Sequence, residues 1–157
     1  MILQRKTRRD RRGTTTVEAA LILPLFFLFL FGLFTIGHAL MIENLLDGAS
    51  RSAARFGSNE GITTAMVEST VIDMLSSSMD TSNVDIIVKD GSSFDNDGTL
   101  PTTEEEYDNL PNIDVAQAGH RQLFLVRAKV RYNDVAILPV PLVGNIVLSG
   151  ESLTRHE

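Results

Sequence analysis

The feature that constrains this chain most is the stretch from Ala19 to Ile42, which contains no Asp, Glu, Lys or Arg. A helix rises about 1.5 Å per residue, so about 20 apolar residues cross a hydrocarbon core of about 30 Å. The stretch is also longer than the apolar core of an ordinary secretory signal, which has about 7–15 residues. We therefore predict a transmembrane helix over about residues 19–42.

Charge is distributed unevenly on the two sides of this stretch. The 157 residues carry a formal net charge of −6, but the first twelve hold six basic residues and a single acidic one. Positive charge beside a span is retained in the cytoplasm, so we expect a cytoplasmic N-terminus and an acidic extracytoplasmic remainder. A basic cluster can also indicate nucleic-acid binding, but beside a hydrophobic helix we favour the membrane and expect no nucleic-acid partner.

The chain divides into three parts by composition. Residues 1–13 form a basic leader that ends in glycine, and residues 14–56 read as one long helix, apolar first and amphipathic later. The sequence "GSNEG" at residues 57–61 predicts a break, because glycine favours a helix stop and a turn. Residues 57–157 are then the extracytoplasmic α/β head.

Periodicity within the head predicts one further helix and a small sheet. One helical face is indicated by four apolar residues at i, i+4, i+7 and i+8: Val67, Val71, Met74 and Leu75. Three segments read as strands: 84–89, 123–132 and 146–154. We predict an α+β fold of the type IV pilin-like kind: a long N-terminal helix, one additional helix and an antiparallel sheet.

The segment 123–132, "LFLVRAKVRY", has the clearest alternation. Five apolar residues share one face: Phe124, Val126, Ala128, Val130 and Tyr132. Arg127, Lys129 and Arg131 point the other way. Pro139 and Pro141 argue against a central strand in the segment that follows. The polar stretch 91–119 is long enough to be a functional or flexible loop.

Several classes of chemistry have no support. The chain has no cysteine, so it holds neither a disulfide framework nor a thiolate metal site. His38, His120 and His156 lack metal-ligand spacing, and no nucleophilic triad, phosphate loop or H-E-x-x-H motif occurs. We expect no enzymatic activity and no cofactor.

One loop has the spacing of a calcium site. In Ser93–Glu104, Asp95, Asp97 and Glu104 fall at positions 3, 5 and 12 of a twelve-residue calcium loop. Position 1 is Ser93 instead of aspartate, and the flanks do not read as two helices. Oxygen-rich turns are common in plain loops, so we favour a simple polar turn over calcium.

Glu18 lies at the edge of the apolar stretch, where a carboxylate costs free energy. A snorkelling or protonated interfacial residue is the simplest interpretation. However, a basic leader, Gly13, four residues, Glu18 and an apolar helix together resemble a type IV prepilin signal. This resemblance implies that a prepilin peptidase cleaves between Gly13 and Thr14. Glu18 would then be able to neutralise the new α-amine of a sister subunit and set the register of assembly.

The resemblance extends to one family, the TadE-like minor pilins or pseudopilins of the tight-adherence (Tad) pilus. Its opening pattern is carried by Arg12, Gly13, Val17, Glu18, Ala20, Leu21 and Pro24. The small-residue pattern that ends the helix is carried by Ala49, Arg51, Ala53, Ala54, Arg55 and Gly57. Ala19 departs from the family, which commonly has a bulky apolar residue after the glutamate.

The resemblance implies a role in assembly, adhesion and secretion at the bacterial inner membrane, with one membrane span. Its implied partners are sister pseudopilins, a major pilin, the prepilin peptidase and an inner-membrane assembly platform. Within the small-residue pattern, the alanines, Ala53 and Ala54 included, would allow close packing. Arg51 and Arg55 would meet acidic residues of another subunit, or else belong to a solvated face in which Asp47 pairs with Arg51.

Two other interpretations stay open. One is an uncleaved single-span envelope protein whose head binds a ligand or a protein. The other is an exported protein cut near "GHA" at residues 37–39, which would begin at Leu40.

Overall fold

A computed structural model describes residues 10–97, 101–137 and 145–157, with the main chain alone for residues 10–14, 96 and 97. Helix α1 (Asp10–Gly57) is followed by α2 (Thr64–Ser76), and a three-stranded sheet completes the head. The predicted α+β layout is confirmed. The segment with Pro139 and Pro141 lies outside the described residues.

The sheet is antiparallel, with the strand order β1-β2-β3. Its strands are β1 (Asp85–Asp90), β2 (Leu123–Arg131) and β3 (Val147–Arg155). The bounds differ from the predicted ranges by one residue at most at each end. The central strand is β2, whose Arg127 pairs with Ile87 on one side and with Glu151 on the other.

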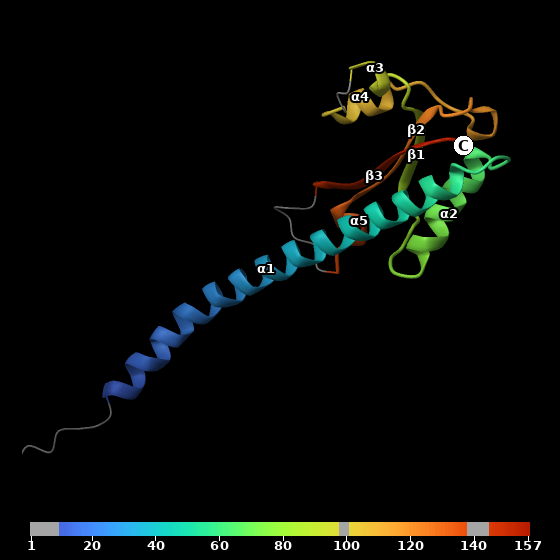
Figure 1. Cartoon of the computed structure of the whole chain (residues 1–157). Coiled ribbons are helices and arrows are strands. Elements are labelled where there is room, and N and C mark those ends of the chain that lie inside the picture. The colour runs from blue at the N-terminus through green and yellow to red at the C-terminus, as the bar shows by residue number, and fades with distance from the viewer. Residues whose placement is uncertain (1–9, 98–100, 138–144) are drawn as a thin grey trace, which may run out of the picture. The chain divides into compact units, whose positions relative to one another are not determined.

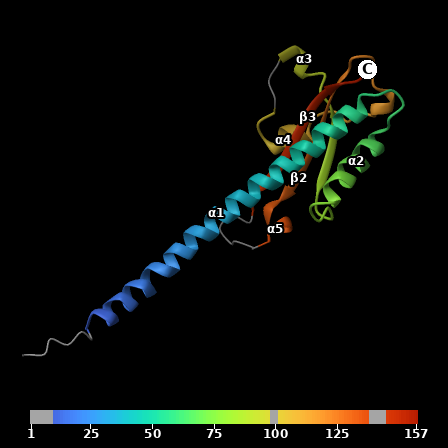
Figure 2. The same cartoon turned by 60° about the horizontal axis from the view of Figure 1, so that its bottom comes forward.

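The inner face of the sheet is covered by α2 and the second part of α1, which lie side by side in both views of Figures 1 and 2. Val67, Val71 and Leu75 of α2 are at most 1 % exposed, as their helical spacing predicted, whereas Met74, predicted on the same face, is 42 % exposed. The alternating apolar residues of β2 are also buried there, and Phe124 is fully buried. These side chains form one core.

The turn between the two helices depends on two glycines. Gly61 has a φ of 79°, in the left-handed region that glycine adopts without steric cost. Gly57 ends α1, and a Cβ there would lie 2.7 Å from Cγ2 of Val67. Thr63 then caps the N-terminus of α2, because its side chain accepts a hydrogen bond from the Met66 N–H.

The described residues of the long segment between β1 and β2 include several short helices. It contains α3 (Phe94–Asp97), α4 (Glu104–Asp108) and the 3₁₀ helix η1 (Val115–Gln117). A further short helix, α5 (Tyr132–Val135), follows β2 directly. The prediction named one additional helix, and the described residues contain several short helices besides it.

Candidate functional site

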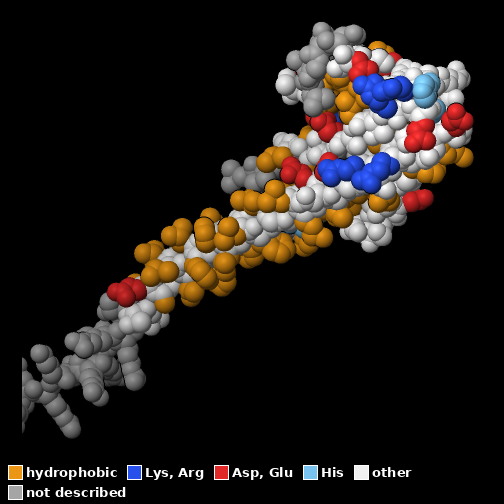
Figure 3. Space-filling model, viewed as in Figure 1, with side chains coloured by type: hydrophobic (Ala, Val, Ile, Leu, Met, Phe, Trp, Pro, Cys, Tyr) orange, Lys and Arg blue, Asp and Glu red, His pale blue; other side chains and the backbone are white. Residues whose placement is uncertain are grey.

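The first part of α1 is exposed and apolar. The structure contains one described helix that is long and apolar enough to cross a membrane by length and composition. Large hydrophobic side chains from Val17 to Ile36 are between 41 and 79 % exposed. They cover much of this segment on the face shown in Figure 3. Such a surface suits a hydrocarbon environment better than water.

The predicted processing residues belong to the beginning of α1. Gly13 and Thr14 are helical, and only their main chain is described. Glu18 is exposed, and no described residue forms an ion pair with it. The chain around Pro24 remains within α1. A carboxylate at this place is thus accessible to a group from another molecule.

The small-residue stretch of α1 brings the helix close to the sheet. Ala49 is 2 % exposed, and Ala53 and Ala54 are fully buried. Opposite them, a Cβ on Gly150 of β3 would lie 2.1 Å from the Asp47 nitrogen. Because real Cβ atoms never approach a main chain so closely, only glycine fits between this strand and the helix.

One buried hydrogen bond fixes the same contact. The Ser50 hydroxyl donates to the Gly150 carbonyl at 2.9 Å, and Ser50 is fully buried. On the opposite side of α1, Arg51 and Arg55 are exposed, and Arg51 pairs with Asp47 one turn earlier. The alanines therefore line the core, while the two arginines face outward.

The outer face of the sheet contains a buried arginine that the alternation in β2 did not predict. Arg127 is only 4 % exposed, pairs with Glu104 and donates to the Ser149 hydroxyl at 3.2 Å. Its guanidinium carbon lies 3.7 Å from the ring centroid of Tyr107, a cation–π contact. Burial, followed by a hydrogen bond to Glu151, raises the pKa of Tyr107 to about 12.

Helix α4, whose Glu104 and Tyr107 contact Arg127, begins with a well-formed helix cap. Thr103 and Glu106 form a capping box, in which each side chain bonds to the other residue's main-chain N–H. Hydrogen bonds from the N–H groups of Thr102 and Thr103 lower the pKa of the Glu106 carboxyl. The sequence did contain a signal for this contact. It consists of the capping box, the acidic residues of the same helix and the alternating basic residues of β2.

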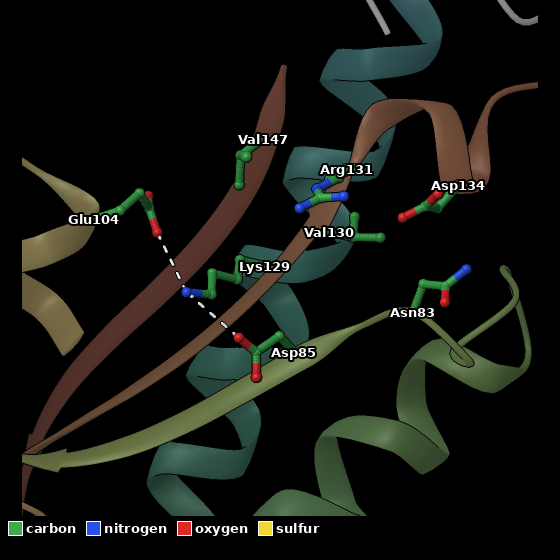
Figure 4. A pocket seen from close by; sticks show the side chains of 8 residues that line it. All are labelled: Asn83, Asp85, Glu104, Lys129, Val130, Arg131, Asp134 and Val147. Carbon is green, nitrogen blue, oxygen red and sulfur yellow. Dashed lines mark ion pairs between the residues drawn. The ribbon is translucent and has the colours of Figure 1, made fainter. Parts of the chain in front are cut away.

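A charged pocket of about 430 Å³ lies beside this contact (Figure 4). Lys129 reaches into it, with Asp85 and Asp108 both at 3.4 Å and Glu104 at 3.6 Å. Burial lowers the pKa of Lys129, but attraction to Asp108 and Asp85 outweighs it, so the pKa is raised. Lys129 is thus already surrounded by carboxylates.

Two of the calcium candidates, Asp95 and Glu104, have described side chains, and each pairs with a different arginine. Asp95 pairs with Arg155 at 2.5 Å, and Glu104 pairs with Arg127. The hydrogen bond to Asp95 raises the pKa of Arg155. The side chain of Asp97 lies outside the described residues. Among the described side chains, no group of three histidine or carboxylate residues is arranged to hold a metal ion.

Comparison with known proteins supports the N-terminal resemblance. No curated protein and no solved structure matches the chain. The model of one family, described as TadE-like protein, matches residues 13–55. This range begins at the predicted processing glycine and ends in the small-residue stretch. The match confirms, over residues 13–55, the resemblance to the TadE-like family that the sequence predicted.

Proposed function

We propose that this protein is a pilin-like subunit associated with a Tad-type pilus and its secretion machine. The observation that carries the proposal is the family match at residues 13–55, which includes Gly13, Glu18 and the buried alanines. The exposed apolar part of α1 is consistent with a membrane anchor. The head would then act outside the membrane as a packing module.

The charge distribution supports one orientation. The basic leader precedes the apolar part of α1, and all but one of the acidic residues follow the leader. By the positive-inside rule, the leader stays in the cytoplasm and the head is extracytoplasmic. The protein would thus cross the bacterial inner membrane once.

Assembly in this proposal depends on removal of the leader. Cleavage between Gly13 and Thr14 by a prepilin peptidase creates an α-amine near the cytoplasmic edge of the membrane. Glu18 of a sister subunit neutralises this amine, so that two charges costly in lipid are paired only on assembly. Partners would be sister pseudopilins, a major pilin and the assembly platform.

The exposed arginines of α1 offer a second assembly contact. Among the described residues, Arg55 forms no ion pair and Arg51 pairs only with Asp47 on its own helix. Exposed pairs of this kind contribute about 0.3–0.5 kcal/mol, so a subunit with acidic residues can displace them at little cost. Acidic residues of a sister subunit are the proposed partners.

Mass spectrometry of the purified native protein tests the processing step. A mature chain that begins at Thr14 supports the proposal. An intact leader contradicts it and favours an uncleaved envelope protein, and a chain that begins at Leu40 indicates an exported protein. The same measurement on a Gly13→Val variant, in which the leader should remain, serves as the control.

A Glu18→Ala variant tests the role of the carboxylate. Membrane insertion should be normal, but sister subunits should no longer co-purify after cross-linking. The matched control is Glu60→Ala, which removes an exposed carboxylate in the turn after α1. Co-purification of Glu18→Ala at the level of Glu60→Ala would contradict the proposed pairing.

A further inference from the structure

The two edges of the sheet differ in how they are covered. At the β1 edge, Lys89 forms a bridge with Asn112, and the Asp90 N–H donates to the Pro111 carbonyl at 2.8 Å. At the β3 edge, no described segment pairs with the strand. An uncovered edge is a template for another extended chain.

The hydrogen-bond pattern identifies which groups of β3 face outward. The Tyr132 N–H donates to Ile146, and the His156 N–H donates to Gln122. Both pairs involve even-numbered residues, Ile146 just before β3 and His156 just after it. In an antiparallel ladder, only every second residue of a strand bonds to a given neighbouring strand. The N–H and C=O groups of Ser149, Glu151 and Leu153 therefore point away from β2. Among the described residues, no main-chain partner bonds to them.

This open edge lies in a cavity of about 500 Å³, here called the β3 groove. That volume is within the range of known ligand sites. The groove is bounded by β3, by α1 and by the segment that leads into α4. Its lining includes Ser149, Gly150 and Glu151 of β3, Glu43 and Asp47 of α1, and Thr102.

The charges of the β3 groove favour a cationic occupant. Asp47 pairs with Arg51, but no described cation pairs with Glu43 or with Glu151. The Glu151 carboxylate accepts a hydrogen bond from the Tyr107 hydroxyl. Carboxylates without a cation in a partly enclosed groove attract basic side chains, because the local dielectric is lower than that of water.

A buried donor also lines the β3 groove. Arg127 is 4 % exposed, and its Nε and Nη1 have no hydrogen-bond partner in the described structure. Buried polar groups without a partner are uncommon in folded proteins. Both nitrogens are themselves buried, so this side chain has to shift before the carbonyl of an incoming main chain can bond to them.

We propose that the β3 groove binds an extended basic segment of a partner protein, which adds to the sheet as a fourth strand beside β3. Main-chain groups of the partner bond to Ser149 and Glu151, and its basic side chains lie against Glu43 and Glu151. Strand addition of this kind obtains affinity from the main chain and specificity from alternate side chains. This inference does not depend on the proposed processing or pilus role.

Binding of a model peptide to the full-length chain in detergent micelles tests the proposal. The probe is a fluorescein-labelled hexapeptide of alternating lysine and valine, and the comparison peptide has glutamate in place of lysine. Fluorescence anisotropy should show at least tenfold tighter binding of the lysine peptide. Equal binding of the two peptides, or no binding of either, would overturn the proposal.

Variants locate the binding within the chain. The double variant Glu43→Gln and Glu151→Gln should weaken binding of the lysine peptide about tenfold, which corresponds to about 1.4 kcal/mol. Both substitutions keep the size of the side chain, and circular dichroism checks the fold. The matched control is Glu68→Gln on α2, and an effect of the double variant no larger than that of Glu68→Gln would count against the groove.

A methylated peptide distinguishes strand addition from charge attraction alone. Methylation of the alternate nitrogens that face β3 removes the N–H donors of the ladder and leaves the lysine charges unchanged. Methylation of the other nitrogens is the control. We expect loss of binding only in the first case, and equal binding of both methylated peptides would contradict strand addition.

Discussion

The two parts of helix α1 differ in the exposure of their apolar side chains. From Val17 to Ile36, large apolar side chains are exposed, so this part requires another hydrophobic environment. From Ile42 to Ala54, Ile42, Leu46 and three alanines lie in the core of the head, and Ala53 and Ala54 are fully buried. Helix length alone therefore says little about what a helix packs against. The size and spacing of its side chains say more.

Two phenylalanines, one in each part of the molecule, test this difference and give the largest expected effect. Phe124 is fully buried in the head, and Phe29 is 60 % exposed in the first part of α1. Phe124→Ala should lower the free energy of unfolding of the head by about 3–5 kcal/mol, because it leaves a cavity. Phe29→Ala should leave that value unchanged. Thermal unfolding in micelles, followed by near-ultraviolet circular dichroism, measures both, and equal losses would refute the distinction.

A smaller effect is expected from two glycines. Gly150→Ala places a methyl group against the main chain of α1, and overpacking of this kind costs about 1–3 kcal/mol. Gly48→Ala is the control, because a Cβ there meets no atom within 4 Å. That change should stabilise α1 by about 0.5–1 kcal/mol, since alanine favours a helix more than glycine. Denaturant unfolding decides, and a stabilising Gly150→Ala would be the contrary result.

The smallest effect concerns the polar cover of the head. Burial raises the pKa of Tyr107 to about 12, above the ordinary value of about 10 for tyrosine. The neutral hydroxyl thus contributes stability below about pH 10, and this contribution is lost as the pH rises through about 12. Tyr107→Phe should cost about 1 kcal/mol at neutral pH and progressively less above pH 10. A difference that stays constant from pH 8 to 12 would contradict this assignment.

Local patterns were sufficient to predict most of the elements. The charge-free run at Ala19–Ile42 predicted a helix by its length, and the spacing of Val67 and Val71 predicted another by the way side chains repeat along a helix. The strand at Leu123 followed from alternation in the same way. Its pairing with both β1 and β3 depends on contacts between distant residues, which no local pattern specifies.

The environment of Arg127 was not predicted, for a physical reason. Alternation states only that Arg127 and Phe124 lie on opposite faces of β2, and it does not tell which face is exposed. In the structure, α4 covers the second face, and its Tyr107 and Glu104 enclose the guanidinium. Gly150 did carry a signal, because glycine within a strand often marks a close approach of another main chain.

The bond between Ser50 and Gly150 has a consequence for how helix and sheet can move. If α1 slid along β3 by one turn, its main chain would meet a side chain of β3 where it now meets Gly150. The buried Ser50 hydroxyl would also lose its acceptor, the Gly150 carbonyl. The contact between Ser50 and Gly150 therefore permits only one position of α1 along β3. Any rearrangement of the head must separate the two elements outright, because gradual slippage is blocked.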